Sequence, residues 1–196
     1  MLTCPRLVLA AAAAALLSGV AGCAKQQPAT PVTFGGTDRA WIEITIAMDE
    51  QVRPLLDLVP AHSTDPTLRA AAEQVRSLVD AELPTLRRLH DQAGLSPANP
   101  HTGMEMPGLV TATQLAHAAT LYGREFDAFT AAALRGFLKH GADLARSETE
   151  NGAEAQTKAL AATATRVRAR ALSALPPGAA RQPAARSASM TASSTP

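Results

Sequence analysis

The sequence predicts an all-α fold in which four amphipathic helices pack into one bundle. Alanine, leucine, arginine and glutamate dominate the composition, and these residues favour helices. Apolar residues recur at steps of three and four in four long stretches, as they do along the buried face of a helix. Helices of similar length with one apolar face each can bury those faces only by packing together, which predicts a four-helix bundle.

The first helix is predicted over residues 38–60. Pro54 lies inside this stretch and is expected to kink the helix, because proline lacks an N–H group and clashes with the preceding turn. The apolar face of this helix is formed by Trp41, Ile44, Met48, Val52, Leu55 and Val59.

The second helix is predicted to begin at Asp65-Pro66 and to end at Gly94. An aspartate can accept hydrogen bonds from the first turn, and proline suits the first helical position. Pro84 lies inside the stretch and predicts either a bend or an early end of the helix. The apolar face is formed by Leu68, Ala72, Val75, Val79 and Leu86.

The second half of the domain follows a loop over residues 94–110 that is rich in glycine and proline. Thr111 and Gln114 have the spacing of a capping box, which predicts a short helix to about Tyr122. A long helix over 124–150 follows.

Asn151-Gly152 is expected to end that long helix, and the last helix is predicted over residues 153–174. Its arginines Arg166, Arg168 and Arg170 could form a basic patch for anionic lipid, but alternate residues of a helix point to different faces. We therefore expect these arginines on a solvated surface. Acidic and basic residues nearly balance over the whole chain, which gives no electrostatic reason to expect a nucleic-acid partner.

The first residues have the pattern of a signal peptide over 1–22, in which Arg6 precedes an alanine-rich apolar run. The run is about fourteen residues long, and a bilayer core requires roughly twenty. Val20-Ala21-Gly22-Cys23 resembles a lipobox, which predicts cleavage before Cys23 and a diacylglyceryl group on its sulfur. The alternative is an ordinary secreted protein cut after a small residue. The lipid would hold the protein at the extracytoplasmic face of the cell membrane.

The mature chain is expected to have three parts: a lipidated flexible tether over 23–37, a helical domain over 38–175, and a disordered tail over 176–196. Cys4 lies in the signal peptide, so the folded domain has no free thiol. This excludes disulfides and zinc–cysteine sites in the domain.

Short motifs in both halves of the domain resemble the domain of unknown function 305 family. The resemblance covers residues 38 to about 174 and implies a ferritin-like bundle built from two helical hairpins. Some members of that family are associated with copper or other metals in the cell envelope. The motifs are Asp38-x-x-Trp41, Glu50-Gln51, Leu58-Val59-Pro60, Thr64-Asp65-Pro66-x-Leu68-Arg69, Glu82-Leu83, Gly103-Met104, Gln114-Leu115, Phe126-Asp127, Ala145-Arg146 and Glu150-Asn151-Gly152.

The sequence departs from the family pattern where metal ligands are expected. The pattern has a His-His pair in the first long helix of each half, a following methionine and a Gln-x-x-Glu step, and such side chains on facing helices suit a metal. Apolar residues at these places imply that the metal site has been lost and its polar interior filled. The departures are Met48-Asp49 and Phe137-Leu138 at the histidine pairs, Val79 for the glutamine, and Leu55 and Leu86 for methionines, while Glu82 keeps the acidic position.

A residual metal site is the alternative. His101, Met104 and Met106 form a His-x-x-Met-x-Met group whose imidazole and thioethers suit Cu(I), and His140 could join them. These residue types are also common in packing and on surfaces, and His140 can be read as a partly buried histidine satisfied by a hydrogen bond.

No phosphate-binding loop, nucleophile elbow or Glu-x-x-His pair is present, so we expect no enzyme activity. The sequence therefore predicts a lipid-anchored envelope protein with a non-catalytic binding or structural role, no cofactor and an unidentified envelope partner. The alternative is a copper-binding or metal-tolerance protein that uses the residual histidine and methionine site.

Overall fold

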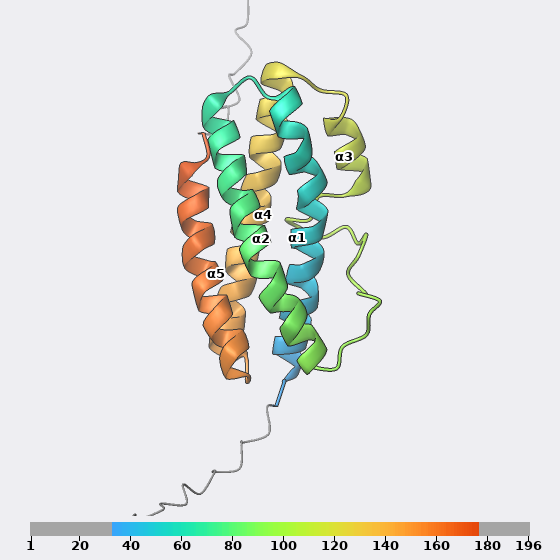
Figure 1. Ribbon diagram of the computed structural model, residues 1–196, viewed down its shortest axis with the longest axis vertical. Coiled ribbons are helices and arrows are strands. Elements are labelled where there is room, and N and C mark those ends of the chain that lie inside the picture. Colours follow the sequence, from blue (N-terminus) through green and yellow to red (C-terminus); the bar gives the residue numbers. More distant parts are fainter. Residues whose placement is uncertain (1–32, 177–196) are drawn as a thin grey trace, which may run out of the picture. The chain divides into compact units, whose positions relative to one another are not determined.

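The computed structural model describes residues 33–176 as an assembly of α-helices, and these residues contain no strand (Figure 1). This confirms the all-α prediction. The predicted signal peptide, Cys23, most of the tether and the tail beyond Pro176 lie outside the described residues. The helices are α1 (Gly36–His62), α2 (Pro66–Gln92), α3 (Ala112–Ala118), α4 (Gly123–Asn151) and α5 (Ala155–Ala174).

The four long helices form two antiparallel hairpins, α1 with α2 and α4 with α5 (Figure 1). The connection over residues 93–122 carries α3 and climbs the length of the bundle, so α4 begins at the same end as α2. Two hairpins joined by one long crossover have the topology of ferritin-like bundles. The predicted ferritin-like four-helix bundle is therefore confirmed.

Two helices, α2 and α3, begin at the predicted capping residues. The Asp65 carboxylate accepts hydrogen bonds from the N–H groups of Thr67 and Leu68 at 2.8 and 3.3 Å. Thr111 and Gln114 form both bonds of a capping box, at 3.1 and 2.9 Å. These caps satisfy N–H groups that have no partner within the first helical turn.

The prediction that α2 could stop at Pro84 is wrong, because the helix continues to Gln92. Pro84 is exposed, whereas Leu83 and Leu86 beside it are buried in the core. Packing of the residues on both sides of Pro84 therefore stabilises the helix, although the proline cannot donate the usual backbone hydrogen bond. The first helix likewise continues through Pro54.

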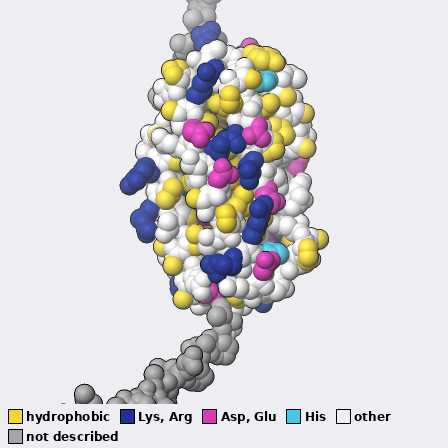
Figure 2. Space-filling view, viewed as in Figure 1, with side chains coloured by type: hydrophobic (Ala, Val, Ile, Leu, Met, Phe, Trp, Pro, Cys, Tyr) yellow, Lys and Arg dark blue, Asp and Glu magenta, His cyan; other side chains and the backbone are white. Residues whose placement is uncertain are grey.

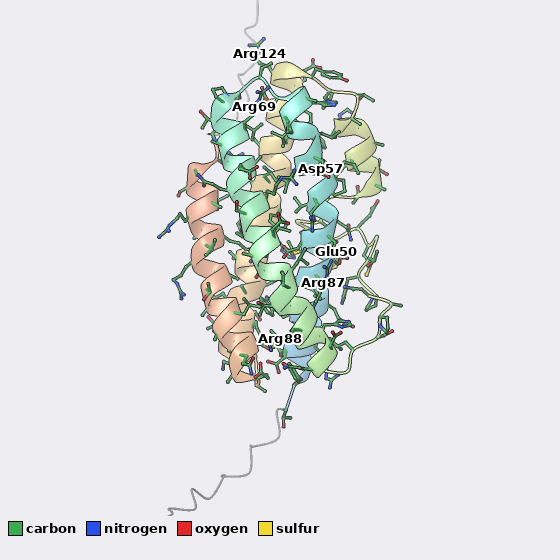
Figure 3. The ribbon with its side chains drawn as sticks, viewed as in Figure 1. Glu50, Asp57, Arg69, Arg87, Arg88 and Arg124 are labelled. Carbon is green, nitrogen blue, oxygen red and sulfur yellow. The ribbon has the colours of Figure 1, made fainter. Side chains whose placement is uncertain are left out.

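The seam between α1 and α2 carries a ladder of exposed ion pairs. Figure 2 shows basic and acidic side chains interleaved on this face, and Figure 3 labels Glu50, Asp57 and Arg87 among them. The pairs follow the antiparallel register of the two helices, and each contributes about 0–1 kcal/mol because solvent screens it. They are Asp57–Arg76 at 2.8 Å, Arg53–Asp80 at 3.4 Å and Glu50–Arg87 at 2.9 Å.

Candidate functional site

Three charged side chains meet in the centre of the bundle: Asp49 from α1, Glu82 from α2 and Arg168 from α5. We call them the central cluster. Their exposed fractions are 0, 6 and 1% respectively, so all three are buried. Asp49 lies at the middle of its helix and the other two lie near the middle of theirs, which places the cluster at half the height of the bundle.

The guanidinium of Arg168 joins two helices through its two terminal nitrogens. Nη1 lies 3.0 Å from Oε1 of Glu82 and 2.8 Å from Oε2. Nη2 donates to Oδ1 of Asp49 at 3.3 Å. The planar fork of an arginine presents its donors in a fixed geometry, which suits a bridge between two carboxyl groups.

The fourth helix, α4, makes room for this side chain. The guanidinium carbon of Arg168 lies 5.7 Å from the ring centre of Phe137. A Cβ atom at Gly141 would lie 2.6 Å from Nε and 3.0 Å from Cδ of Arg168. A glycine inside a helix is normally unfavourable, so Gly141 is explained by the arginine that crosses it.

Burial raises the pKa values of both carboxyl groups of the central cluster. Burial and the nearby Glu82 raise the pKa of Asp49 well above its usual value, although Arg168 opposes the shift. Burial also raises the pKa of Glu82, again against the effect of Arg168. Both shifts have the same cause, because a medium of low polarity disfavours the ionised form of each carboxyl group and Arg168 opposes this effect.

Arg168 corrects two sequence predictions. Arg166 and Arg170 are exposed as expected, but Arg168 is buried. It lies on the same helical stripe as Ala161, Ala164 and Ala171, all buried, and this stripe was the signal that could have found it. The second prediction is that apolar residues fill the interior. The structure differs, because the acidic residues Asp49 and Glu82 lie buried at its centre.

The apolar residues at the other positions where this chain differs from the family pattern do lie in the core. Met48, Val79, Phe137 and Leu138 are each at most 1% exposed. A core of such side chains has low polarity, which strengthens the attraction between the guanidinium of Arg168 and its carboxyl partners.

The predicted metal ligands lie on the crossover and on α4. Met104 is 45% exposed, and its N–H donates to the carbonyl of His101 at 3.2 Å in a turn. Met106 packs against the core. His140 on α4 is partly buried and lies against Gly108 of the crossover, so the structure brings it near the Met106 segment.

Both histidines of this group have one buried nitrogen without a hydrogen-bond partner, Nδ1 of His101 and Nε2 of His140. The interpretation of His140 as a residue satisfied by a hydrogen bond is therefore wrong for Nε2. Among residues 33–176, no three His, Cys, Asp or Glu side chains are arranged to hold a metal ion.

A second buried acidic group, which we call the end cluster, lies where α1 begins and α4 passes into α5. It consists of Asp38, Glu148 and Glu154, with exposed fractions of 0, 0 and 5%. Asp38 accepts hydrogen bonds from the N–H groups of Gly35, Ala153 and Glu154, at 2.6, 3.0 and 3.0 Å. Sequence reasoning assigned none of these three acids a role in a site.

The three carboxyl groups of the end cluster differ in their protonation. Burial opposes the ionisation of Asp38, but its backbone N–H donors hold its pKa below the usual value. Burial and the neighbouring Asp38 raise the pKa of Glu148 to about 8. Glu154 caps α5 through the N–H groups of Gln156 and Thr157, and these bonds lower its pKa despite burial.

The fold and the central cluster define a ferritin-like four-helix bundle whose core holds an internal cation. The chain belongs to the family described as Domain of unknown function (DUF305), whose model matches residues 38–175. No curated protein matches the sequence. No helix among the described residues is both long enough and apolar enough to cross a membrane.

Two solved structures have a similar fold. One is a DUF305 protein from Streptomyces coelicolor described as a "putative secreted protein"; it has a TM-score of 0.62 and 18% sequence identity, over 71% of this chain and 89% of that chain. The other is a DUF305 fragment from Deinococcus radiodurans, with a TM-score of 0.64 and 12% identity, over 74% of this chain and 95% of that chain.

Proposed function

We propose that this protein is a lipid-anchored, extracytoplasmic bundle with a non-catalytic binding or structural role, and that its core is neutralised by Arg168 instead of a metal. The observation that carries the second part is the guanidinium of Arg168 between Asp49 and Glu82. A cation already fixed at this point competes with any metal ion for the same two carboxyl groups.

The pattern around Cys23 and the similarity to a protein named as secreted support the first part of the proposal. The anchor is tested by fractionating cells that express the full chain or its Cys23→Ala variant. We expect the unchanged chain in the membrane fraction and the variant in the soluble fraction. A variant that stays with the membrane would overturn the anchor.

The core is tested by titrating the full chain with Cu(I), Cu(II) and Zn²⁺ and following binding by calorimetry. We expect Asp49→Asn and Glu82→Gln to leave any metal uptake unchanged, because the guanidinium occupies both carboxyl groups. Stoichiometric binding that either substitution abolishes would show that the central cluster takes a metal.

A second candidate function is copper binding by His101, Met104, Met106 and His140. The unpaired nitrogens of His101 and His140 favour it, because a buried nitrogen without a partner is free to bind a metal. Micromolar or tighter Cu(I) binding that is lost on changing Met104 and Met106 to leucine, but kept in a Met190→Leu control, would support copper handling. Unchanged binding in the double variant would exclude this site.

A further inference from the structure

A groove lies on the surface between α2 and α5, which are neighbouring helices of the bundle (Figure 1). It consists of two hollows of about 160 and 520 Å³, and these adjoin because Leu78, Ala81 and Val167 line both. Glu82 borders the smaller hollow, but this side chain is only 6% exposed and pairs with Arg168. The groove therefore presents a surface that the central cluster does not use.

The middle of the groove is lined by exposed side chains without charge. They come from α2 (Gln74, Ser77, Ala81) and from α5 (Thr163, Val167). Val167 is 41% exposed, and only two other large apolar side chains of residues 33–176 are exposed. The opposite edge of α2 carries the ladder of ion pairs, so the two edges of one helix differ in character. The centre of a protein–protein interface is depleted of charged residues in the same way.

Two opposite charges flank one end of the groove, near the start of α2 and the end of α5. Glu73 lies on the α2 wall and Arg170 lies on the α5 wall, and both are exposed. Within residues 33–176, no carboxyl oxygen lies within 4.0 Å of Arg170, and Glu73 pairs only with Nε of Arg76, at 3.9 Å. An acid and a base on opposite walls are therefore available to a partner that presents the complementary pair.

We propose that a second copy of this chain covers the groove, in a dimer whose two-fold axis runs parallel to the bundle. Such an axis places α2 of each copy against α5 of the other. Glu73 of one copy then faces Arg170 of the second, and symmetry forms the same pair again. Val167 of each copy packs against Leu78 and Ala81 of the other, which buries its exposed apolar surface.

The direction of the axis also agrees with the proposed anchor. A two-fold axis parallel to the bundle places the first turns of both α1 helices at one end, as two chains anchored in one membrane require. A perpendicular axis would place these turns at opposite ends and would bring α2 against α2. This step alone rests on the anchor at Cys23, whereas the groove and its charges do not.

The test is analytical ultracentrifugation of the full chain from micromolar to millimolar concentration. The protein carries Cys23→Ala, so the result does not depend on lipid. We expect a dimer, and we expect Val167→Glu to raise its dissociation constant at least about tenfold, because this substitution buries a charge in the apolar interface. A chain that stays monomeric would overturn the proposal. If dodecanoate then binds and Val167→Glu prevents it, the groove takes an acyl chain instead.

Exchange of the two charges tests the arrangement. Arg170→Glu sets two glutamates against each other at both contacts, and Glu73→Arg sets two arginines against each other. Each variant alone should therefore dimerise at least about tenfold more weakly. An equal mixture of the two variants should form mixed dimers as tight as the unchanged dimer, because both contacts then join opposite charges.

The control is Arg124→Glu, which makes the same change of charge at an exposed residue in the first turn of α4. It should leave the dissociation constant unchanged, and thermal melting verifies that each variant is folded. A mixture that stays monomeric, or an equal effect of Arg124→Glu and Arg170→Glu, would overturn the proposed arrangement.

Discussion

The central and end clusters both bury carboxyl groups, but they neutralise them by different means. In the central cluster the partner is the guanidinium of Arg168. In the end cluster, backbone N–H groups serve Asp38 and Glu154, and Glu148 keeps a proton. The difference follows from position along the helices. In mid-helix every N–H already bonds to the carbonyl four residues before it, whereas the first turn of a helix leaves N–H groups free.

The largest expected effect comes from removing the cation of the central cluster. Arg168→Met leaves Asp49 and Glu82 buried without a positive partner, and such a loss is unfavourable by about 3–5 kcal/mol. The measurement is chemical denaturation of the variant and of Arg166→Met, an exposed control on the same helix. A loss below about 1 kcal/mol for Arg168→Met would show that the arginine does not neutralise the core.

Removing all three charges should recover most of that loss. The variant Asp49→Leu, Glu82→Leu, Arg168→Met replaces the cluster by apolar side chains, and replacements of this kind are often neutral or stabilising. We expect its free energy of unfolding to return to within about 1–2 kcal/mol of the unchanged protein. A triple variant no more stable than Arg168→Met would mean that the arginine acts by packing against Phe137 and Gly141 and not by charge.

These two clusters also mark the limit of sequence-based prediction. The sequence predicts the four long helices and the caps of α2 and α3, because apolar periodicity and the capping residues Asp65 and Thr111 act locally. Arg168 was missed, because its burial depends on partners from two other helices that are 86 and 119 residues away. Two local features are consistent with a buried Arg168: Gly141 inside α4 and the buried alanines on the same face of α5 as Arg168. Neither feature predicts the burial of Arg168 until the packing of the helices is known.

In the end cluster, Asp38→Ala should reduce stability by about 1–3 kcal/mol. The substitution removes the acceptor of three backbone N–H groups and separates the start of α1 from the loop before α5. Chemical denaturation measures the effect, with Asp57→Ala on the exposed side of α1 as the control. An equal loss of stability in the two variants would mean that the backbone hydrogen bonds accepted by Asp38 do not stabilise the fold.

The pH dependence of stability should separate Glu148 from its neighbours. Its pKa is about 8 in the folded protein and near 4.5 in the unfolded chain, so between these values the folded state binds more protons. The free energy of unfolding therefore falls as pH rises through this window. Asp49 and Glu82 contribute with the same sign, because their pKa values are also raised. Melting temperatures from pH 5 to pH 9 should consequently fall less steeply in Glu148→Gln, and identical slopes would refute the assignment.

The smallest effect is expected at the exposed ladder between α1 and α2. Arg53→Ala should change stability by only about 0–1 kcal/mol, because Arg53 and Asp80 are 43 and 49% exposed and water replaces the lost partner. Denaturation in low and high salt measures the effect, which should shrink further as salt screens the pair. Arg53 and Arg168 both pair with carboxyl groups. A much larger loss of stability at Arg168 than at Arg53 would therefore be due to the burial of Arg168. A loss at Arg53 comparable with that at Arg168 would instead mean that the ladder fixes the register of the hairpin.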